Sequence, residues 1–375
     1  MKSYKFRIYP NREQKQILEQ TIETCRLLYN ESLQQRRTDK RLSYYDQKKQ
    51  LTQQRKTVKE SLNHIHSQVL QNVLLRLERA FQNFHRDMSM GHPCFKRRGR
   101  YNSITYAQYG GFQIKENKLK LSFVKGLIKI KLNRIPIGSL KTCTIIRDID
   151  RWFACISTNV KNSSSIKSNS IIGVDVGLTN WITLSNGQVI DRPDFLNKSI
   201  HKIKTLHQNL SRKKKGSKNR WKAKIQLAKT WRKVKLQRED YCHKVTANLA
   251  ANYKTIVFEK LSIKNMTKSH NLATSILDAT WYQVKQLAAY KAEVKEVNAR
   301  NTTQTCSQCG LIVGKDLSIR LHECLNCGLK LDRDHNAALN ILHLGQELTL
   351  AERKPILVSK VNRNKQVNID EARSP

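Results

Sequence analysis

The sequence predicts a multidomain α+β protein, in which an N-terminal β-barrel with a helical insertion precedes an α/β domain that contains a four-cysteine zinc ribbon. Three observations lead to this prediction. Short alternating apolar segments and two amphipathic helices fill the first 160 residues. Two Cys-x-x-Cys pairs stand near the C-terminal end of the chain. Lysine and arginine number 70 against 29 aspartate and glutamate residues, which leaves a formal net charge of +41 on 375 residues.

This charge predicts a polyanionic partner, and nucleic acid is the expected one. The basic residues are spread along the chain, so the basic surface should belong to folded elements. An acidic membrane surface is the competing partner. Against it, no apolar run reaches the length of a transmembrane helix, and residues 1–10 lack the apolar core of a signal peptide. We therefore expect a cytoplasmic protein without a membrane partner.

The first domain is expected to cover residues 1–160, with the helical insertion at about 11–90. After the insertion the period of the apolar residues changes to two, which is typical of strands. Six short strands separated by glycine and asparagine are predicted, at about 103–107, 112–115, 119–123, 127–132, 142–147 and 152–159. Strands of this length and number favour an antiparallel barrel or sandwich.

Local signals define the elements before these strands. Residues 3–9 alternate apolar and basic side chains and predict a strand that Pro10 ends. Asn11 followed by Gln14 predicts a capping box at the start of a long helix. Apolar residues at helical spacing predict a second helix over residues 67–86.

A polar segment at residues 161–170 is the predicted linker to the second domain, which is expected to cover residues 171–344. Residues 171–178 predict a buried strand that carries Asp175 and is the first of several adjacent antiparallel strands. Residues 345–375 are expected to form a flexible tail.

The middle of this domain is predicted to be helical and basic. Residues from about 201 to 250 form helices broken near Gly216, and a further helix is predicted over about 275–293. Two tryptophans among these charges could stack on bases. A stripe at helical spacing instead favours a buried face, formed by Leu227, Trp231 and Val234.

The two cysteine pairs predict one structural zinc ion. Tetrahedral zinc takes four thiolates, and two Cys-x-x-Cys turns joined by a short ribbon supply them. A glycine follows each pair and suits such a turn, because glycine tolerates positive φ. A redox dithiol or unrelated buried cysteines would not explain two such turns so close together. The ribbon is expected at about residues 303–330, with the ligands Cys306, Cys309, Cys324 and Cys327.

Three acidic residues are candidates for a catalytic metal site. Asp175 lies within a predicted strand, Glu259 ends another, and Asp334 begins a helix. Hydrolysis of a phosphodiester by two Mg²⁺ ions needs rigid carboxylates held close together. The order strand-Asp, strand-Glu, helix-Asp describes an RNase H-like nuclease core.

Each acid also has a simpler explanation. Asp175 could lie at a bulge and accept backbone hydrogen bonds, and Glu259 could pair with one of many lysines. Either Asp332 or Asp334 could merely cap the helix that follows. We favour Asp332 as the capping residue and Asp334 as the metal ligand, because only the joint arrangement uses all three acids.

These segments resemble a known family. The motifs Gly-Val-Asp-Val-Gly-Leu (173–178), Ile-Val-Phe-Glu-Lys-Leu (256–261), Thr-Gln-Thr-Cys-Ser-Gln-Cys-Gly (303–310) and Asp-Arg-Asp-His-Asn-Ala-Ala (332–338) are similar to the acidic motifs and zinc ribbon of the RuvC-like half of the transposon-associated TnpB (OrfB) family, compact relatives of type V CRISPR effectors. Phe-Arg-Ile-Tyr-Pro (6–10) and Phe-Lys-Arg (95–97) resemble its barrel and recognition lobe.

The resemblance implies an RNA-guided DNA endonuclease with a single RuvC-like site, associated with an insertion sequence. In such a protein, base pairing reads the target, while the protein holds the heteroduplex and reads a short adjacent motif. The implied partners are a guide RNA from the transposon end and target double-stranded DNA, bound by one copy of the chain.

Two other functions remain open from the sequence. In the family, several residues, commonly with a glycine, separate the helix ending near Glu293 from the next strand, and here they are missing. A guided DNA-binding protein with impaired or lost cleavage is therefore one alternative. An accessory transposition protein is another, and a strand-joining transposase is a third, less favoured reading.

Overall fold

The computed structural model describes residues 1–57, 60–107, 109–160, 170–268, 270–298, 300–316 and 318–353. The chain divides into two compact units, residues 1–164 and 165–375. The predicted linker at 161–170 falls almost entirely outside the described residues. None of the helices in the described ranges combines the length and apolar character needed to span a bilayer.

The N-terminal unit contains a seven-stranded sheet in which every neighbouring pair is antiparallel, in the order β2-β6-β7-β1-β5-β4-β3. The Tyr106 hydroxyl on one edge strand donates to the carbonyl of Ser122, close to the opposite edge, at 3.3 Å. The sheet is therefore a nearly closed barrel, as predicted. Its strands are β1 (Lys2–Tyr9), β2 (Ser103–Tyr106), β3 (Phe112–Lys115), β4 (Lys118–Leu121), β5 (Ile128–Lys131), β6 (Ser139–Asp148) and β7 (Arg151–Asn159).

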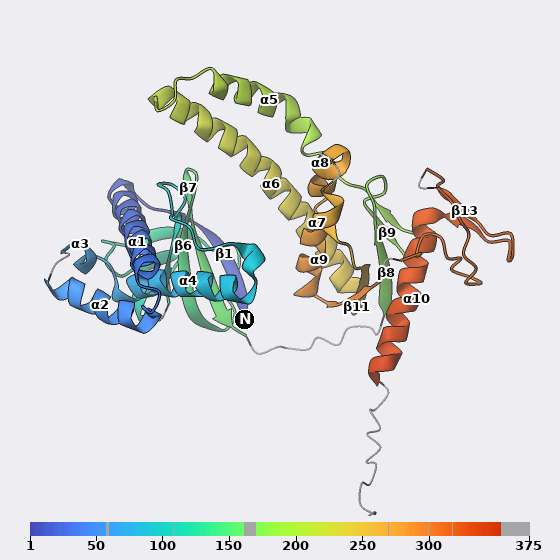
Figure 1. Ribbon diagram of the computed structural model, residues 1–375, viewed down its shortest axis with the longest axis horizontal. Coiled ribbons are helices and arrows are strands. Elements are labelled where there is room, and N and C mark those ends of the chain that lie inside the picture. Colours follow the sequence, from blue (N-terminus) through green and yellow to red (C-terminus); the bar gives the residue numbers. More distant parts are fainter. Residues whose placement is uncertain are drawn as a thin grey trace, which may run out of the picture. The chain divides into compact units, whose positions relative to one another are not determined.

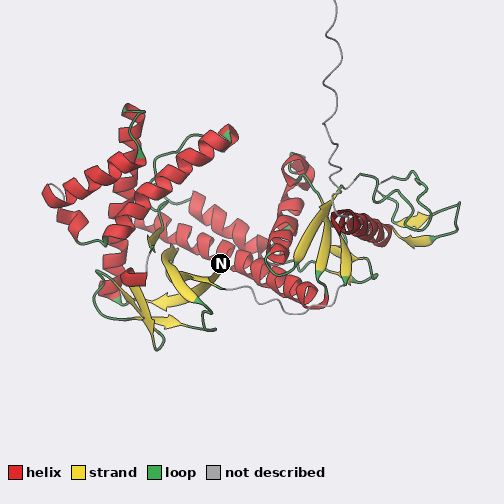
Figure 2. Ribbon diagram, turned by 90° about the horizontal axis from the view of Figure 1, so that it is seen from below, coloured by secondary structure: helices red, strands yellow, loops and turns green. Residues whose placement is uncertain are grey.

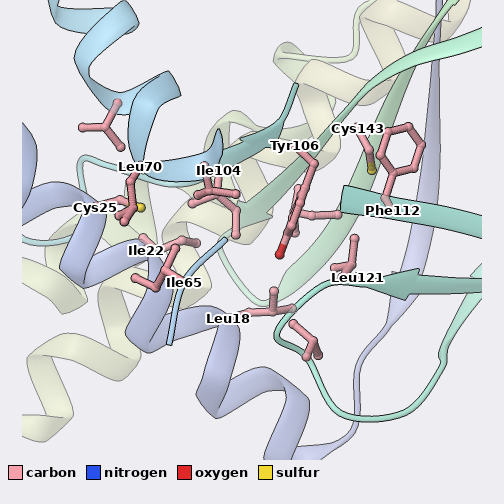
Figure 3. Close-up of a cluster of buried hydrophobic side chains, with 14 of the residues drawn as sticks. Leu18, Ile22, Cys25, Ile65, Leu70, Ile104, Tyr106, Phe112, Leu121 and Cys143 are labelled. Carbon is pink, nitrogen blue, oxygen red and sulfur yellow. The ribbon is translucent and has the colours of Figure 1, made fainter. Parts of the chain in front are cut away.

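A helical insertion follows β1 and packs on this barrel. Its helices are α1 (Arg12–Thr38), α2 (Tyr44–Thr57), α3 (Glu60–Asn63) and α4 (Ser67–Arg86). Two short 3-10 helices follow in the chain, at Met88–Met90 and Tyr109–Gly111. The capping box is confirmed, because Asn11 accepts from the Gln14 N–H at 2.8 Å and Gln14 accepts from the Asn11 N–H at 3.1 Å. Helices and strands share one core, shown in Figure 3 by side chains such as Leu18, Ile22, Cys25, Leu70, Ile104, Tyr106 and Leu121.

The C-terminal unit is built on a five-stranded sheet in the order β10-β9-β8-β11-β12. Strand β9 runs antiparallel to both β8 and β10, as expected for the strands around Asp175, whereas β11 lies parallel to both β8 and β12. The strands are β8 (Ile171–Val176), β9 (Ile182–Leu184), β10 (Val189–Ile190), β11 (Thr255–Glu259) and β12 (Glu293–Val297).

Helices cover both faces of this sheet. On one face lie the second half of the basic helix α6 (Lys218–Asn252), and also α7 (Ile263–Met266), α8 (His270–Ala279) and α9 (Trp281–Ala289). The basic helix α5 (Asn197–Ser211) packs on the first half of α6 and not on the sheet. On the other face lies α10 (Arg333–Arg353), beyond which the hairpin of β13 (Leu321–Glu323) and β14 (Lys330–Asp332) extends (Figures 1 and 2). The α5–α6 break near Gly216, with φ +86°, agrees with the sequence prediction.

Three predictions in this unit are wrong. The helix expected over 275–293 is two helices, because Thr280 adopts a left-handed φ of 54° between them, and residue 293 already begins β12. Helix α10 continues to Arg353, so the tail does not begin at 345. Trp231 is 40% exposed, although Leu227 and Val234 are buried. Only one helix, α5, covers this part of α6, so only a narrow stripe is buried.

The short connection before β12 does not disturb the sheet. Residues 290–292 turn the chain, and β12 pairs with β11 in continuous register from Thr255 opposite Glu293 to Glu259 opposite Val297. The strand that carries Glu259 is therefore fully paired on this side.

Candidate active site and zinc ribbon

Asp175 and Glu259 occupy neighbouring positions on adjacent parallel strands. The last paired residues of β8 and β11 are Val174 and Phe258, and the two acids follow them directly. Residues at the same level of parallel strands point to the same face, so both carboxylates lie on one side of the sheet. Val174 and Phe258 point to the opposite side, into the core beneath α6 and α9.

Helix α10 brings the third acid to this face. A Cβ on Gly173 would overlap the carbonyl oxygen of Ala338 and lie 2.7 Å from the Leu342 nitrogen, so the backbone of α10 rests directly on β8. Asp334 precedes Ala338 by four residues and therefore lies on the same side of the helix. Since Asp175 follows Gly173 by two residues on the same face, the helix start is directed toward Asp175.

The three acids influence one another electrostatically. Asp175 is 6% exposed, and burial first, then the charges of Glu259 and Asp334, raise its pKa well above the usual range. Burial raises the pKa of Glu259 to about 7. A buried carboxyl group whose pKa is raised by neighbouring carboxylates, as that of Asp175 is, favours a cation beside it.

The acids are nevertheless not a tight cluster. Among the described residues, one group of three or more potential metal ligands has all its ligand atoms within 4.8 Å of one another. This group is the four cysteines of the ribbon and does not include the three acids. The three carboxylates are more widely spread. Thr183 on β9 lies directly opposite Asp175 on β8. Its buried hydroxyl has no hydrogen-bond partner among the described residues. A polar atom left free at this position fits a site that holds an ion and its water ligands.

Asp334 is surrounded by donors that the sequence did not reveal. Asn180 donates to its Oδ2 at 3.1 Å, and Arg320 approaches the same oxygen at 3.4 Å. Arg333 approaches Oδ1 at 3.3 Å. The Arg320 guanidinium also donates to the Thr179 hydroxyl at 2.5 Å. A positive charge thus already meets this carboxylate, and Arg320 comes from the ribbon, 14 positions before Asp334.

Asp332 caps α10. Its Oδ1 accepts from the backbone N–H of Asp334 at 2.9 Å and of His335 at 3.1 Å. These are two of the donors that a helix start leaves without intrahelical partners. The capping role predicted for Asp332 is confirmed, and the side chain of Asp334 is left to face the sheet.

The four cysteines converge as a zinc site requires. Sγ of Cys306 lies 3.6 Å from that of Cys327, and Sγ of Cys309 lies 3.6 Å from that of Cys324. Both turns have the same construction. The N–H of each following glycine donates to the carbonyl of the first cysteine, at 3.0 and 2.8 Å, and both glycines have positive φ, 78° and 73°. The sulfur set fits one tetrahedral zinc ion.

Two asparagines of α10 fasten the ribbon to the helix. Asn336 accepts from the Ser307 N–H at 2.9 Å and donates to the Thr305 carbonyl at 2.8 Å. Asn340 donates to the carbonyls of Thr302 and Thr305. Both are buried and lie four residues apart on an otherwise apolar face, a signal that the sequence does contain. Hydrogen bonds therefore join the first cysteine turn of the ribbon to the helix that carries Asp334.

Comparison with known proteins identifies the family. A model described as "Probable transposase" (OrfB_IS605) matches residues 155–270, one described as "Cas12f1-like, TNB domain" matches residues 281–341, and a "Helix-turn-helix domain" matches residues 1–41. A Streptomyces pristinaespiralis protein named "Putative RNA-guided DNA endonuclease" is 31% identical over 360 residues, which cover 92% of this chain and 89% of that protein.

The chain belongs to the TnpB (OrfB) family. Another similar protein, "Putative RNA-guided DNA endonuclease InsQ" of Escherichia coli K12, is 29% identical over 374 residues, which cover 92% of each chain. Among solved structures, the "Cryo-EM structure of the Cas12f1-sgRNA-target DNA complex" aligns with a TM-score of 0.56 at 17% identity, over 88% of this chain and 83% of that one. This likeness is one of fold, and the aligned part of the chain includes residues of both units.

Proposed function

We propose that this protein is an RNA-guided DNA endonuclease of an insertion sequence, with an RNase H-like (RuvC-like) catalytic core in its C-terminal unit. The observation that carries the proposal is the position of Asp175 on the sheet face beside Glu259 and Asp334, where burial and the charges of these two acids raise the pKa of Asp175. The printed names of two relatives, each covering about nine-tenths of this chain, agree with the proposed activity.

In this proposal Asp175, Glu259 and Asp334 are the catalytic residues and hold two Mg²⁺ ions. When bound, such ions stabilise the attacking and leaving oxygens of a phosphodiester and lower the pKa of a water molecule. Because paired ions sit about 4 Å apart, their ligands must spread more widely than those of a single ion. Oxygen atoms of the three carboxylates do not all lie within 4.8 Å of one another, and the ligands of two separate ions need not do so.

The neighbouring side chains have supporting roles. Asp332 orients the start of α10, and the Thr183 hydroxyl is free to hydrogen-bond a water molecule beside Asp175. The guanidinium groups of Arg320 and Arg333, which contact Asp334, would bind the scissile phosphate if it were held beside this carboxylate. Fixed positive groups of this kind stabilise charge that develops in a transition state.

The cysteine ribbon would hold a single structural zinc ion through Cys306, Cys309, Cys324 and Cys327. Guide RNA and target double-stranded DNA are the proposed partners, bound by one copy of the chain, and the formal charge of +41 supplies the attraction. A cytoplasmic location follows from these partners.

Cleavage of guided DNA by the purified complex tests the proposal. The protein is co-expressed with its transposon-end RNA, and a plasmid that carries the matching target is incubated with Mg²⁺. Cutting by Asp175→Ala should fall by at least about 100-fold, because one of the proposed metal ligands is lost, while RNA and DNA binding persists.

Three other outcomes would contradict this function. Metal-dependent cutting by Asp175→Ala would place the active site elsewhere. Guided binding by the wild type without cutting would support the DNA-binding alternative. Products in which a transposon end is joined to target DNA would support a transposase, the activity that one matching family description names.

A further inference from the structure

A pocket of about 930 Å³ lies within the helical insertion of the N-terminal unit, far along the chain from the three acids. It is bordered by the end of α1, the start of α2 and the second half of α4. Its volume is at the upper end of the range for sites that bury small molecules. Nothing in the proposed cleavage chemistry uses it.

One wall of the pocket is cationic. Arg36, Arg37, Lys40 and Arg41 line it, against the single acid Glu78. Arg36 is 9% exposed and is held in place by Glu78 at 2.7 Å, by Gln47 at 2.8 Å and by the face of Phe81 at 5.2 Å. Its Nη2 is buried and has no hydrogen-bond partner among the described residues. A fixed guanidinium with an unused donor is suited to a phosphate oxygen.

The other wall is aromatic. The His92 ring lies 5.3 Å from the ring of Phe81 and 5.3 Å from that of Phe84. Tyr45, the second residue of α2, also lines the pocket and is 71% exposed. Exposed rings beside guanidinium groups are typical of surfaces on which nucleic-acid bases stack.

We propose that this pocket binds one or two unpaired nucleotides, with a base stacked on Tyr45 or Phe84 and a phosphate held by Arg36 and Arg37. A duplex keeps its bases inside and cannot offer them to a pocket of this size, so the ligand is single-stranded. The inference rests on the proposed function only in taking nucleic acid as the ligand. It adds a single-strand site in the N-terminal unit, whereas the three acids lie in the C-terminal unit.

Fluorescence of a base analogue tests the assignment on the full-length protein. Eight-nucleotide single strands of RNA and of DNA, each with one 2-aminopurine, are titrated with wild type, Tyr45→Ala, Tyr45→Trp and Arg37→Ala. Wild type should quench the probe. Tyr45→Ala should lose the quenching and bind about ten-fold more weakly, as expected for one lost stacking partner, and Tyr45→Trp should restore both.

Arg37→Ala should weaken binding and reduce its salt dependence while quenching is retained at saturation, because a phosphate contact is lost and the ring remains. The matched control is Tyr282→Ala, which removes a tyrosine that is 56% exposed in the other unit. It should bind as wild type does. Comparison of the RNA and DNA probes shows which strand the pocket prefers.

Two results would overturn the assignment: quenching and affinity unchanged in Tyr45→Ala, or competition by a blunt duplex as strong as that by the single strand. These results are separable from failure of the nuclease. A wild type that cuts guided DNA but shows no dependence on Tyr45 loses only the pocket. A wild type that quenches the probe but does not cut keeps the pocket and loses the nuclease.

Discussion

The buried carboxylate of Asp175 on the sheet of the C-terminal unit lowers the free energy of unfolding. Asp175 is almost fully buried beside two other carboxylates, and a charge in such surroundings is unfavourable unless a cation meets it. Arg320 and Arg333 meet Asp334, but the charges that influence Asp175 most are negative. Stability given up in this way is common at catalytic sites.

The pH dependence of unfolding should report this cost. The folded-state pKa of Glu259 is about 7, above the ordinary 4.5, so the folded protein binds this proton more tightly than the unfolded chain does. In metal-free buffer the free energy of unfolding should therefore fall as pH rises from about 4.5 to 7, by roughly 2 to 3 kcal/mol, and stay low above pH 7.

Urea denaturation at pH 5 and pH 8 in Mg²⁺-free buffer without a chelator, with wild type and Glu259→Gln, measures this contribution. The variant should lose most of the decrease and be the more stable protein at pH 8. The exposed Glu347→Gln is the control and should behave as wild type. Added Mg²⁺ should stabilise wild type at pH 8 more than Glu259→Gln. Equal pH dependence in the two proteins would mean that Glu259 is not the group responsible.

At the scale of elements, the contact between α10 and β8 decides where Asp334 lies. Gly173 permits the helix backbone to touch the strand, and Gly345 permits a similar approach to Val257 on β11. The buried residues Val257, Val297 and Ile341 fill the remaining space between sheet and helix. Helix position, and with it the distance from Asp334 to Asp175, depends on residues that carry no chemistry.

Gly173→Ala should therefore abolish cleavage and destabilise the fold. The new methyl group would meet the backbone of Ala338 and Leu342, which cannot move aside as a flexible side chain can, so α10 must shift. We expect a loss of about 2 to 4 kcal/mol in the free energy of unfolding, within the upper range for overpacking and backbone strain. Thermal denaturation and the guided cleavage assay measure the two effects.

The control is Gly314→Ala in the ribbon, where an added methyl group would meet nothing within 4 Å and φ is not positive. It should leave both stability and cleavage unchanged. If Gly173→Ala retained full cleavage, the close helix contact would not be what positions Asp334.

A second prediction at the scale of elements concerns zinc binding by the cysteine ribbon. Cys309→Ser should lower bound zinc from about one ion per chain to nearly none, because three thiolates hold the ion far less tightly than four. Cys309 is exposed, so the change leaves the apolar core intact. Elemental analysis of the purified protein gives the zinc content, and cleavage should fall because Asn336 ties the ribbon to the Asp334 helix.

Cys94→Ser provides the comparison, since Cys94 is also exposed but lies outside the cluster. Its zinc content and activity should match those of wild type. Unchanged zinc in Cys309→Ser would show that this cysteine is not a ligand.

For the whole molecule, charge governs the encounter with nucleic acid. The 70 basic residues lie in both units, and four lysines line one groove between α5 and α6: Lys198, Lys202, Lys229 and Lys233. A surface of this kind binds the phosphate backbone through release of counterions.

Affinity for RNA and DNA should therefore fall steeply with salt. With six to ten phosphate contacts, the dissociation constant should rise by about 10³ to 10⁵ between 50 and 200 mM salt. Filter binding over a series of salt concentrations measures the slope. Changing Lys202, Lys229 and Lys233 together to glutamine should reduce the slope by about two to three. A slope near zero would contradict a mainly electrostatic surface.

Much of the architecture was predictable because it depends on near neighbours in the chain. The capping box of Asn11 and Gln14, the alternation in β1 to β7 and the glycines after each cysteine pair are encoded within a few residues of where they act. Thr280 shows the limit, since a single left-handed residue divides a segment whose apolar spacing predicts one helix.

The sequence by itself determined the local elements, the basic character and the zinc turns, and it singled out Asp175, Glu259 and Asp334 as candidates. Only the tertiary structure decided that α10 rests on Gly173, that Arg320 and Asn180 meet Asp334, that Trp231 is exposed, and that Arg36 and Tyr45 border one pocket. The physical reason is distance along the chain. The contacts of Gly173 with α10 and of Asn180 with Asp334 join segments more than a hundred residues apart, and no local pattern of apolar residues, charges or turns encodes which segments will meet.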